Sequence, residues 1–248
     1  MKQNMTITIE AAEHNGVPLR VAVPEGTPRG GVIVLHQAPG YTPQIAEWLQ
    51  RLAENGYAAV APLLHHRRGV EQLDPFEFGG IEEFALALPG DDTVAADIAE
   101  AADYLRRQGI DTANIGALGF SFGGRAALVA ALNGSVAAAT SYYANGIIEP
   151  GYGDNLGLPA LADRLGGLTT PWLGLFGADD FLLAEGELDA IEEALRILDT
   201  HAEVIRYPGA GHAFDMEEFM PGAPSPLIPE AAADARTRTL AFFEQHLS

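Results

Sequence analysis

Short apolar segments alternate with helical patterns along most of this 248-residue chain. The segments are rich in β-branched residues and apolar on both faces, which is typical of strands buried inside a parallel sheet. Strands and helices that alternate in this way form a parallel sheet covered by helices on both faces. We expect parallel strands at 31–35, 57–61, 115–118, 136–142, 172–176 and 203–206, with helices near 43–54, 92–108, 123–132, 158–165, 185–198 and 229–246.

Two further segments complete the expected organisation. Residues 6–9 and 17–23 are predicted to pair as an antiparallel hairpin, because Asn15-Gly16 is a strong turn signal. Residues 62–90 show no clear periodicity, and a segment of this length without it is usually functional or mobile, so we expect a small cap there. The chain shows no repeat or flexible linker, and residues 1–248 are predicted to form one domain.

The segment from Ile115 to Gly124 joins an apolar strand to a helix-forming run through Gly-Phe-Ser-Phe-Gly. A sharp strand-to-helix turn forces its central residue, Ser121, into an unfavourable backbone conformation, and the flanking glycines avoid clashes with the strand and the helix. The Ser121 hydroxyl would then lie beyond the sheet, at the positive end of the helix. This pattern predicts a nucleophile. A serine that only caps the helix is the alternative.

A serine hydroxyl needs a base within hydrogen-bonding distance, and the base needs an acid that orients it. Among seven histidines, His212 stands in a glycine-rich loop after an apolar strand and follows both the nucleophile and the candidate acids. That order is typical of such a turn, so we predict His212 as the base. We expect His14, His201 and His246 to be solvated and His36 to connect loops through its ring nitrogens.

The acid is expected to follow the predicted strand at 172–176. Asp179 and Asp180 both stand there, and spacing alone does not separate them. A carboxylate that only stabilises a turn is the alternative for either residue. We prefer Asp179. Because ligands of such sheets bind beyond the carboxyl ends of the strands, the serine, the histidine and the acid can meet at one edge.

The loop after the first parallel strand is expected to contribute to an oxyanion hole. Backbone N–H groups of Phe122 and of Ala38 or Gln37 are the candidate donors. Polar residues near these loops are expected to line a substrate pocket, although one of the two tyrosines among them could pack in the core. These predicted pocket residues are Gln37, Tyr142, Tyr143 and Asn145.

Composition argues against several classes of partner. A net charge of −20 with only 14 Lys and Arg residues disfavours nucleic acid and anionic membranes. The absence of cysteine excludes disulfides, a thiol nucleophile and Cys-ligated zinc. Adjacent His65 and His66 do not have the spacing of ligands to one metal ion, and no apolar run approaches the ~18 residues of a membrane span. We expect a small-molecule substrate, no metal or cofactor, and a cytoplasmic location.

The chain resembles the dienelactone hydrolase family of α/β-hydrolases from residue 17 to residue 246. The resemblance is carried by 32–37 with Gly40, by 57–62, by the serine turn at 119–124, by the acid turn at 179–182 and by the histidine loop at 207–214. It implies the α/β-hydrolase fold, a mostly parallel twisted sheet with helices on both faces. Comparison of the acid turn also favours Asp179 over Asp180.

This chain departs from the best-known members of that family, which have a cysteine as nucleophile and a glutamate after the loop histidine. Ser121 and Gln37 stand at those positions. A carboxylate does little to ionise a hydroxyl, whose pKa lies far above that of a thiol, so the two changes together imply an ordinary serine esterase. The arginine that holds a substrate carboxylate is replaced by the acidic stretch 215–218. We therefore expect neutral, moderately apolar substrates over anionic ones.

Together these features predict a carboxylesterase that cleaves an ester or a lactone through an acyl-enzyme. Ser121 would attack, His212 would transfer the proton, Asp179 would orient the imidazole, and the amides of Phe122 and Ala38 would stabilise the oxyanion. An acyltransferase or a peptidase with the same triad, and a ligand-binding homologue without catalysis, remain alternatives.

Overall fold

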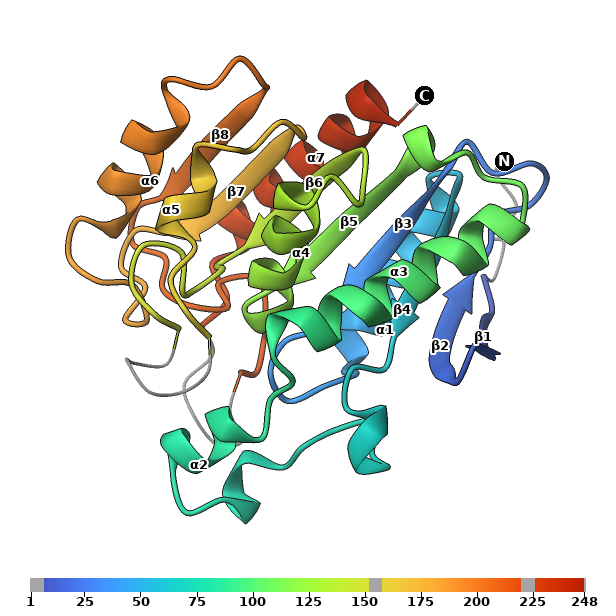
Figure 1. Ribbon diagram of the computed structural model, residues 1–248, viewed down its shortest axis with the longest axis horizontal. Helices are drawn as coiled ribbons and strands as arrows, with labels where there is room; N and C mark the ends of the chain where they lie inside the picture. Colours follow the sequence, from blue (N-terminus) through green and yellow to red (C-terminus); the bar gives the residue numbers. More distant parts are fainter. Residues whose placement is uncertain (1–6, 152–157, 220–225, 248) are drawn as a thin grey trace.

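In the computed structural model, one eight-stranded sheet with the order β1-β2-β4-β3-β5-β6-β7-β8 organises the chain (Figure 1). The structure describes residues 7–151, 158–219 and 226–247. Strand β2 is antiparallel to β1 and β4, and the other neighbouring strands are parallel. The strands are β1 (Ile9–His14), β2 (Val17–Ala22), β3 (Gly30–Leu35), β4 (Tyr57–Pro62), β5 (Ile115–Phe120), β6 (Ala138–Tyr142), β7 (Trp172–Gly177) and β8 (Ala202–Tyr207).

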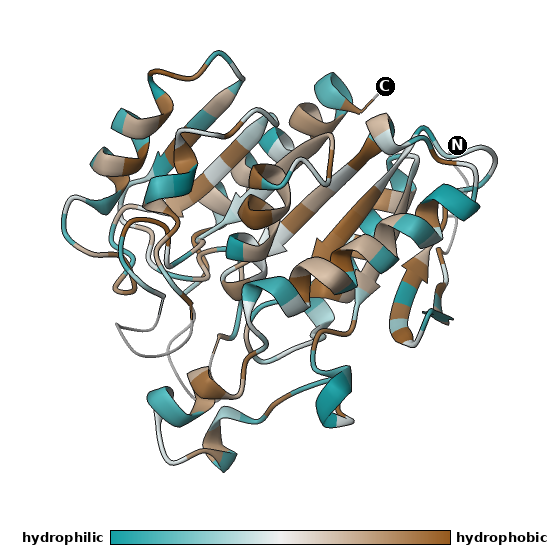
Figure 2. Ribbon diagram, viewed as in Figure 1, coloured by the Kyte–Doolittle hydropathy of each residue, from teal (hydrophilic) through white to brown (hydrophobic). Residues whose placement is uncertain are grey.

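Helices cover both faces of the sheet, as the alternating pattern predicts. One face packs against α3 (Asp91–Arg107), α4 (Phe122–Leu132), α5 (Ala162–Leu165) and α6 (Glu187–Leu195), and the other against α1 (Pro43–Glu54) and α7 (Pro229–His246). The central strands β3 and β5 are buried along their whole length and are largely brown in Figure 2, since both of their faces contact helices. No helix within the described ranges is long and apolar enough to cross a membrane.

Most predicted element boundaries lie within a few residues of the observed ones, but the first strand is an exception. It runs from Ile9 to His14, and the prediction of 6–9 is wrong at residues 7 and 8, which are not in a strand, and right at Ile9. The reason is the turn itself: Asn15 and Gly16 both have positive φ, which is typical of a two-residue hairpin loop. Such a loop requires the paired strands to start directly beside it.

Residues 62–90 lie past the carboxyl ends of β3 and β4 (Figure 1) and contain η1 (His66–Arg68), η2 (Pro75–Glu77) and α2 (Ile81–Leu86). The side chains of Phe76 and Leu86 are exposed. Phe84 is buried in the core, where it packs edge-on against Phe78 with ring centroids 5.4 Å apart. The segment is therefore partly anchored to the body of the protein.

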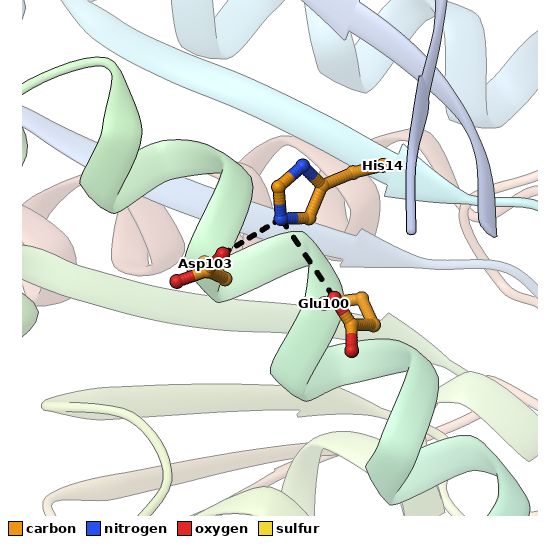
Figure 3. A group of neighbouring side chains, drawn as sticks. All are labelled: His14, Glu100 and Asp103. Atoms are coloured by element: carbon orange, nitrogen blue, oxygen red, sulfur yellow. Dashed lines mark hydrogen bonds and ion pairs between the residues drawn. The ribbon is translucent and has the colours of Figure 1, made fainter. Parts of the chain in front are cut away.

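An ion-pair network attaches the N-terminal hairpin to α3 (Figure 3). His14 Nε2 lies 2.7 Å from Asp103 Oδ2 and 3.7 Å from Glu100 Oε2, so the expectation that His14 is solvated is wrong. The three side chains each bring a potential metal ligand within 4.8 Å of the others. Hydrogen bonds from Arg106, His14 and Arg107 already lower the pKa of Asp103. The carboxylate is therefore paired within the protein, and we assign the group a structural role.

Candidate active site

Ser121 stands at the apex of the turn between β5 and α4. Its backbone angles, φ 52° and ψ −115°, lie in a region that non-glycine residues rarely adopt. A Cβ atom at Gly119 would overlap the carbonyl oxygen of Gly123, and a Cβ atom at Gly123 would overlap that of Leu35. The two glycines therefore permit the close approach of strand and helix, and the N–H of Ser121 is fixed by donating to Tyr142 O at 2.9 Å.

His212 reaches Ser121 from the loop after β8, 91 residues along the chain. Its Nε2 lies 3.0 Å from Ser121 Oγ, a distance suited to proton transfer. This loop packs directly on the end of β7, because a Cβ atom at Gly177 would overlap the carbonyl oxygens of Ala210 and Gly211. The side chains of Ser121 and His212 are almost fully buried, so their hydrogen bond is shielded from water.

The carboxylate that contacts the imidazole is Asp180, and the prediction of Asp179 for that contact is wrong. Asp180 Oδ2 lies 2.7 Å from His212 Nδ1, and Asp180 Oδ1 accepts from the N–H of Leu182 at 2.9 Å. Asp179 has an exposed side chain, and its backbone N–H donates to Ala210 O at 2.9 Å. Since a carboxylate only accepts, it holds the ring proton on Nδ1 and leaves the Nε2 lone pair for Ser121.

His36 connects the loops after β3 and β4, as predicted. Its Nε2 accepts from the N–H of Leu64 at 3.1 Å, so the ring proton is on Nδ1, which donates to Gln37 O at 2.7 Å. Burial, followed by the charge of nearby His65, lowers the pKa of His36 to about 3. The imidazole therefore stays neutral at working pH and keeps both hydrogen bonds.

Phe122 is the first residue of α4. The end of β3 and the start of the loop that holds Ala38 lie against the first turn of this helix, because a Cβ atom at Gly123 would overlap the carbonyl oxygens of Leu35 and His36. A tight turn forms here, because the N–H of Gly40 donates to Gln37 O at 3.0 Å. His65, whose spacing in the sequence does not suit a metal ligand, donates from Nε2 to Ala38 O at 2.8 Å and orients that peptide. The sequence feature that could have identified His65 as a site residue is its position just after the carboxyl end of β4.

A cavity of about 630 Å³ lies beside these residues. It is bounded by the loop after β3, the start of α1, the loop after His212 and the start of α7. Phe219 lines it and packs edge-on against His212, with ring centroids 5.3 Å apart. Phe219 thus separates the cavity from the imidazole of His212, and the cavity is large enough for a small organic molecule.

The structure places one of the four predicted pocket residues in the wall of this cavity, namely Gln37. Tyr142 is completely buried, and its hydroxyl shares a 2.9 Å hydrogen bond with Thr239 of α7. It is thus the tyrosine that packs in the core, the alternative left open by its sequence. Asn145 is also buried and does not contribute to the wall.

Tyr143 adjoins both the reactive pair and the cavity wall without lining the cavity itself. Its ring packs edge-on against His212 at 4.9 Å, and its hydroxyl donates to Asp215 Oδ1 at 2.8 Å. Gln44 Nε2 donates to Asp215 Oδ2 at 2.8 Å. Neither Gln44 nor Asp215 was predicted as a site residue, because one follows Pro43 in α1 and the other is three residues beyond His212, with no shared local motif.

Burial raises the pKa of Asp215 to about 6, although the hydrogen bonds from Tyr143 and Gln44 oppose the shift. Between about pH 4 and pH 6 the folded protein therefore binds more protons at this site than the unfolded chain. The free energy of unfolding should fall as pH rises through that window. Two pKa units correspond to about 3 kcal/mol, and because Asp215 is partly exposed we expect roughly 1–2 kcal/mol.

Urea unfolding of the wild type and of Asp215→Asn at pH 4.5 and pH 7.0 checks this expectation. Asparagine has no charge to lose, so the stability of the wild type relative to the variant should drop by that amount between the two pH values. Identical pH profiles for the two proteins would contradict the assignment.

Arg125, one turn into α4 after Ser121, is a fully buried cation. Its Nε and Nη2 bond the two carboxylate oxygens of Asp91 at 3.0 and 2.7 Å. The guanidinium also donates to the backbone carbonyls of Gly146 and Pro159. It thereby joins the helix that follows the nucleophile to the N-terminus of α3 and to the loop beyond β6.

Comparison with known proteins places this chain in one protein family. A family model described as "Dienelactone hydrolase family" matches residues 17–247. A Yersinia pestis protein named "Putative carboxymethylenebutenolidase" is 34% identical over 220 residues, which span 87% of this chain and 78% of that protein. A Rhodococcus opacus protein named "Carboxymethylenebutenolidase" is 31% identical over 225 residues, spanning 88% of this chain and 81% of its own.

A solved structure shares the architecture over nearly the whole chain. The crystal structure described as "Putative Dienelactone Hydrolase" from Klebsiella pneumoniae superposes with a TM-score of 0.82 at 31% sequence identity. The match covers 97% of this chain and 100% of that one. The eight-stranded sheet with helices on both faces is therefore the α/β-hydrolase fold.

Proposed function

Because the chain belongs to the dienelactone hydrolase family and is a carboxylic ester hydrolase, we propose that Ser121, His212 and Asp180 form its catalytic triad. The observation that carries this proposal is the position of one imidazole between a hydroxyl at 3.0 Å and a carboxylate at 2.7 Å. The substrate is a small carboxylic ester or lactone, and one α/β-hydrolase domain contains the whole site.

In the first half of the proposed reaction, Ser121 Oγ attacks the carbonyl carbon of the ester while its proton passes to His212 Nε2. The backbone N–H groups of Phe122 and Ala38 stabilise the negative charge that develops on the carbonyl oxygen. Collapse of this intermediate breaks the bond to the alcohol, which leaves with the proton from His212. The acyl group remains on Ser121 as an ester.

In the second half, His212 takes a proton from water, and the oxygen of that water attacks the acyl carbon. The new intermediate expels Ser121 Oγ, which recovers its proton from His212, and the carboxylic acid departs. Asp180 stays ionised throughout and holds the proton of Nδ1. For a lactone, the leaving alcohol belongs to the same molecule as the acyl group, so one hydroxy acid is the product.

Labelling with a serine-directed fluorophosphonate tests this proposal. We expect one adduct per chain, located on Ser121 by peptide mass spectrometry, and hydrolysis of 4-nitrophenyl acetate that the label abolishes. Ser121→Ala should lose both properties, and His212→Ala should retain little of either, because the hydroxyl then lacks its base.

Ser135→Ala provides a matched control, since Ser135 is exposed on the surface. That variant should label and hydrolyse as the wild type does. A wild-type protein that neither labels nor hydrolyses any ester, or a label on another residue with activity retained in Ser121→Ala, would refute the triad.

A further inference from the structure

We propose that the cavity beside the triad binds a protonated amine carried by the substrate, with Gln37 and Asp215 setting that preference. This inference rests on the proposed function, because it names the class of ester that the same site cleaves. The sequence led us to expect that neutral esters are preferred to anionic ones. This inference adds that cationic esters are preferred to neutral ones.

The charge of the cavity wall favours a cation. Four carboxylates line it, from Glu47, Asp215, Glu217 and Glu218, and Arg236 supplies the one guanidinium of the described wall. The charge of Arg236 acts on Asp215, whose pKa it lowers. Arg51 pairs with Glu47 from the same helix, so Glu217 and Glu218 are the two carboxylates left to attract a positive group.

Two hydrogen bonds connect the side chains of Asp215, Gln44 and Gln37 in series, and we call these three side chains the amide chain. Ionised Asp215 can only accept, so Gln44 must turn its Nε2 toward the carboxylate, at 2.8 Å. The Oε1 of Gln44 is then left to accept from Gln37 Nε2, at 2.7 Å. The orientation of Gln37 follows from the charge on Asp215 through Gln44, and Gln37 Nε2 also donates to Met216 Sδ at 3.4 Å.

The amide chain ends at Gln37 Oε1, a hydrogen-bond acceptor that has no donor within the described parts of the protein. Gln37 is only 2% exposed, and within the described parts of the protein its Oε1 makes no hydrogen bond. Gln37 lines the cavity, so the side chain that carries this oxygen borders the space that a ligand would occupy. The hydroxyl of Thr42, which also lines the cavity, is likewise buried without a partner within the same ranges. Buried acceptors of this kind are costly to leave unpaired.

A protonated amine satisfies both features of the wall at once. It donates to Gln37 Oε1 and its charge complements the surrounding carboxylates. An alkyl group would leave the oxygen unpaired, and a carboxylate would face both an acceptor and like charges. The expected discrimination between an ammonium ligand and its alkyl counterpart is about 10- to 100-fold, the usual range for a hydrogen bond to a charged group.

Binding can be measured without turnover. Isothermal titration of the wild-type protein with hexylammonium, 2-hexanone and hexanoate should give the tightest binding for hexylammonium and the weakest for hexanoate. Gln37→Met, which keeps the length of the side chain but removes the acceptor, should bring hexylammonium to within a few-fold of 2-hexanone, which has no donor. Gln50→Met, on the exposed side of the same helix as Gln44, should keep the wild-type preference.

Asp215→Asn tests the direction of the amide chain. The side-chain amide introduced at position 215 would donate to Gln44 Oε1, Gln44 would then donate to Gln37 Oε1, and Gln37 would present Nε2 to the cavity. We expect this variant to lose the preference for hexylammonium and to bind 2-hexanone, a pure acceptor, more tightly than the wild type does. An unchanged order of affinities would overturn the proposed role of Asp215.

Turnover supplies the second readout. The first pair of substrates carries the cation in the acyl part and compares the 4-nitrophenyl ester of 6-aminohexanoic acid with that of heptanoic acid. The second pair carries it in the alcohol part and compares the acetate of 5-aminopentan-1-ol with that of hexan-1-ol. We expect the ammonium ester to have the higher kcat/KM in at least one pair, by about 10- to 100-fold. The ratio within each pair corrects for any general loss of activity in a variant.

The outcomes separate this inference from the triad. Equal or weaker binding and turnover of the ammonium compounds, with Ser121-dependent hydrolysis of the neutral esters intact, overturn the cation site and leave the proposed function standing. Absence of all ester hydrolysis, with hexylammonium still bound through Gln37, refutes the triad and supports the cation site.

Discussion

Asp180→Asn should lower kcat for ester hydrolysis by about 10⁴-fold, while Asp179→Asn should change it by no more than a few-fold. An asparagine at 180 presents an amide whose nitrogen cannot accept the Nδ1 proton, so the imidazole is held in the wrong tautomer and Nε2 can no longer take the proton of Ser121. Asp179 is exposed and makes its hydrogen bond through its backbone N–H, which the substitution preserves.

The two adjacent positions make this comparison well controlled. Steady-state kinetics with 4-nitrophenyl acetate give kcat and KM, and thermal unfolding shows whether both variants remain folded. KM should change little for Asp180→Asn, since Asp180 orients the base and is not expected to contact substrate. A large loss in Asp179→Asn together with near wild-type turnover in Asp180→Asn would show that the acid is assigned to the wrong residue.

Arg125→Met should destabilise the protein by about 3–5 kcal/mol, because removal of one partner leaves the remaining groups of a buried ion pair without compensation. The carboxylate of Asp91, with a side chain 19% exposed, loses two hydrogen bonds. The carbonyls of Gly146 and Pro159 also lose their donor. For a protein of this size the melting temperature should fall by about 2–4 °C for each kcal/mol.

Arg196→Met is the matched control for that variant. Arg196 pairs with Glu193 at 2.9 Å, and both side chains are about two-thirds or more exposed, so the expected change is within about 0.5 kcal/mol. Urea unfolding of the three proteins measures the differences. A stability of Arg125→Met within about 1 kcal/mol of the wild type would show that the buried guanidinium does not hold the loop beyond β6 in place.

Local chemistry explains what the sequence predicted correctly. The elbow at Ser121 depends on glycines within two residues of it, and its strained φ of 52° is present in the structure as expected. The bounds of α1 and α7 match the predicted 43–54 and 229–246 because each helix has a proline at its first position. Strand and helix periodicity repeats every few residues, so a single sequence contains enough information to define these elements.

The choice between Asp179 and Asp180 required the folded protein. The two residues follow the same strand and have the same side chain, and only the placement of the loop at 209–213 against Gly177 decides which carboxylate meets His212. Nothing within β7 or its turn contains that information.

The contacts within the amide chain of Gln37, Gln44 and Asp215 also required the folded protein, because these residues come from three segments up to about 180 residues apart. The sequence by itself determined the α/β architecture, the nucleophile turn and the order of the reactive groups, since each depends on neighbours along the chain. Tertiary structure alone decided the partner of His212, the burial of Tyr142 and the polarity of the cavity wall, since each depends on which distant side chains the packed helices and loops bring together.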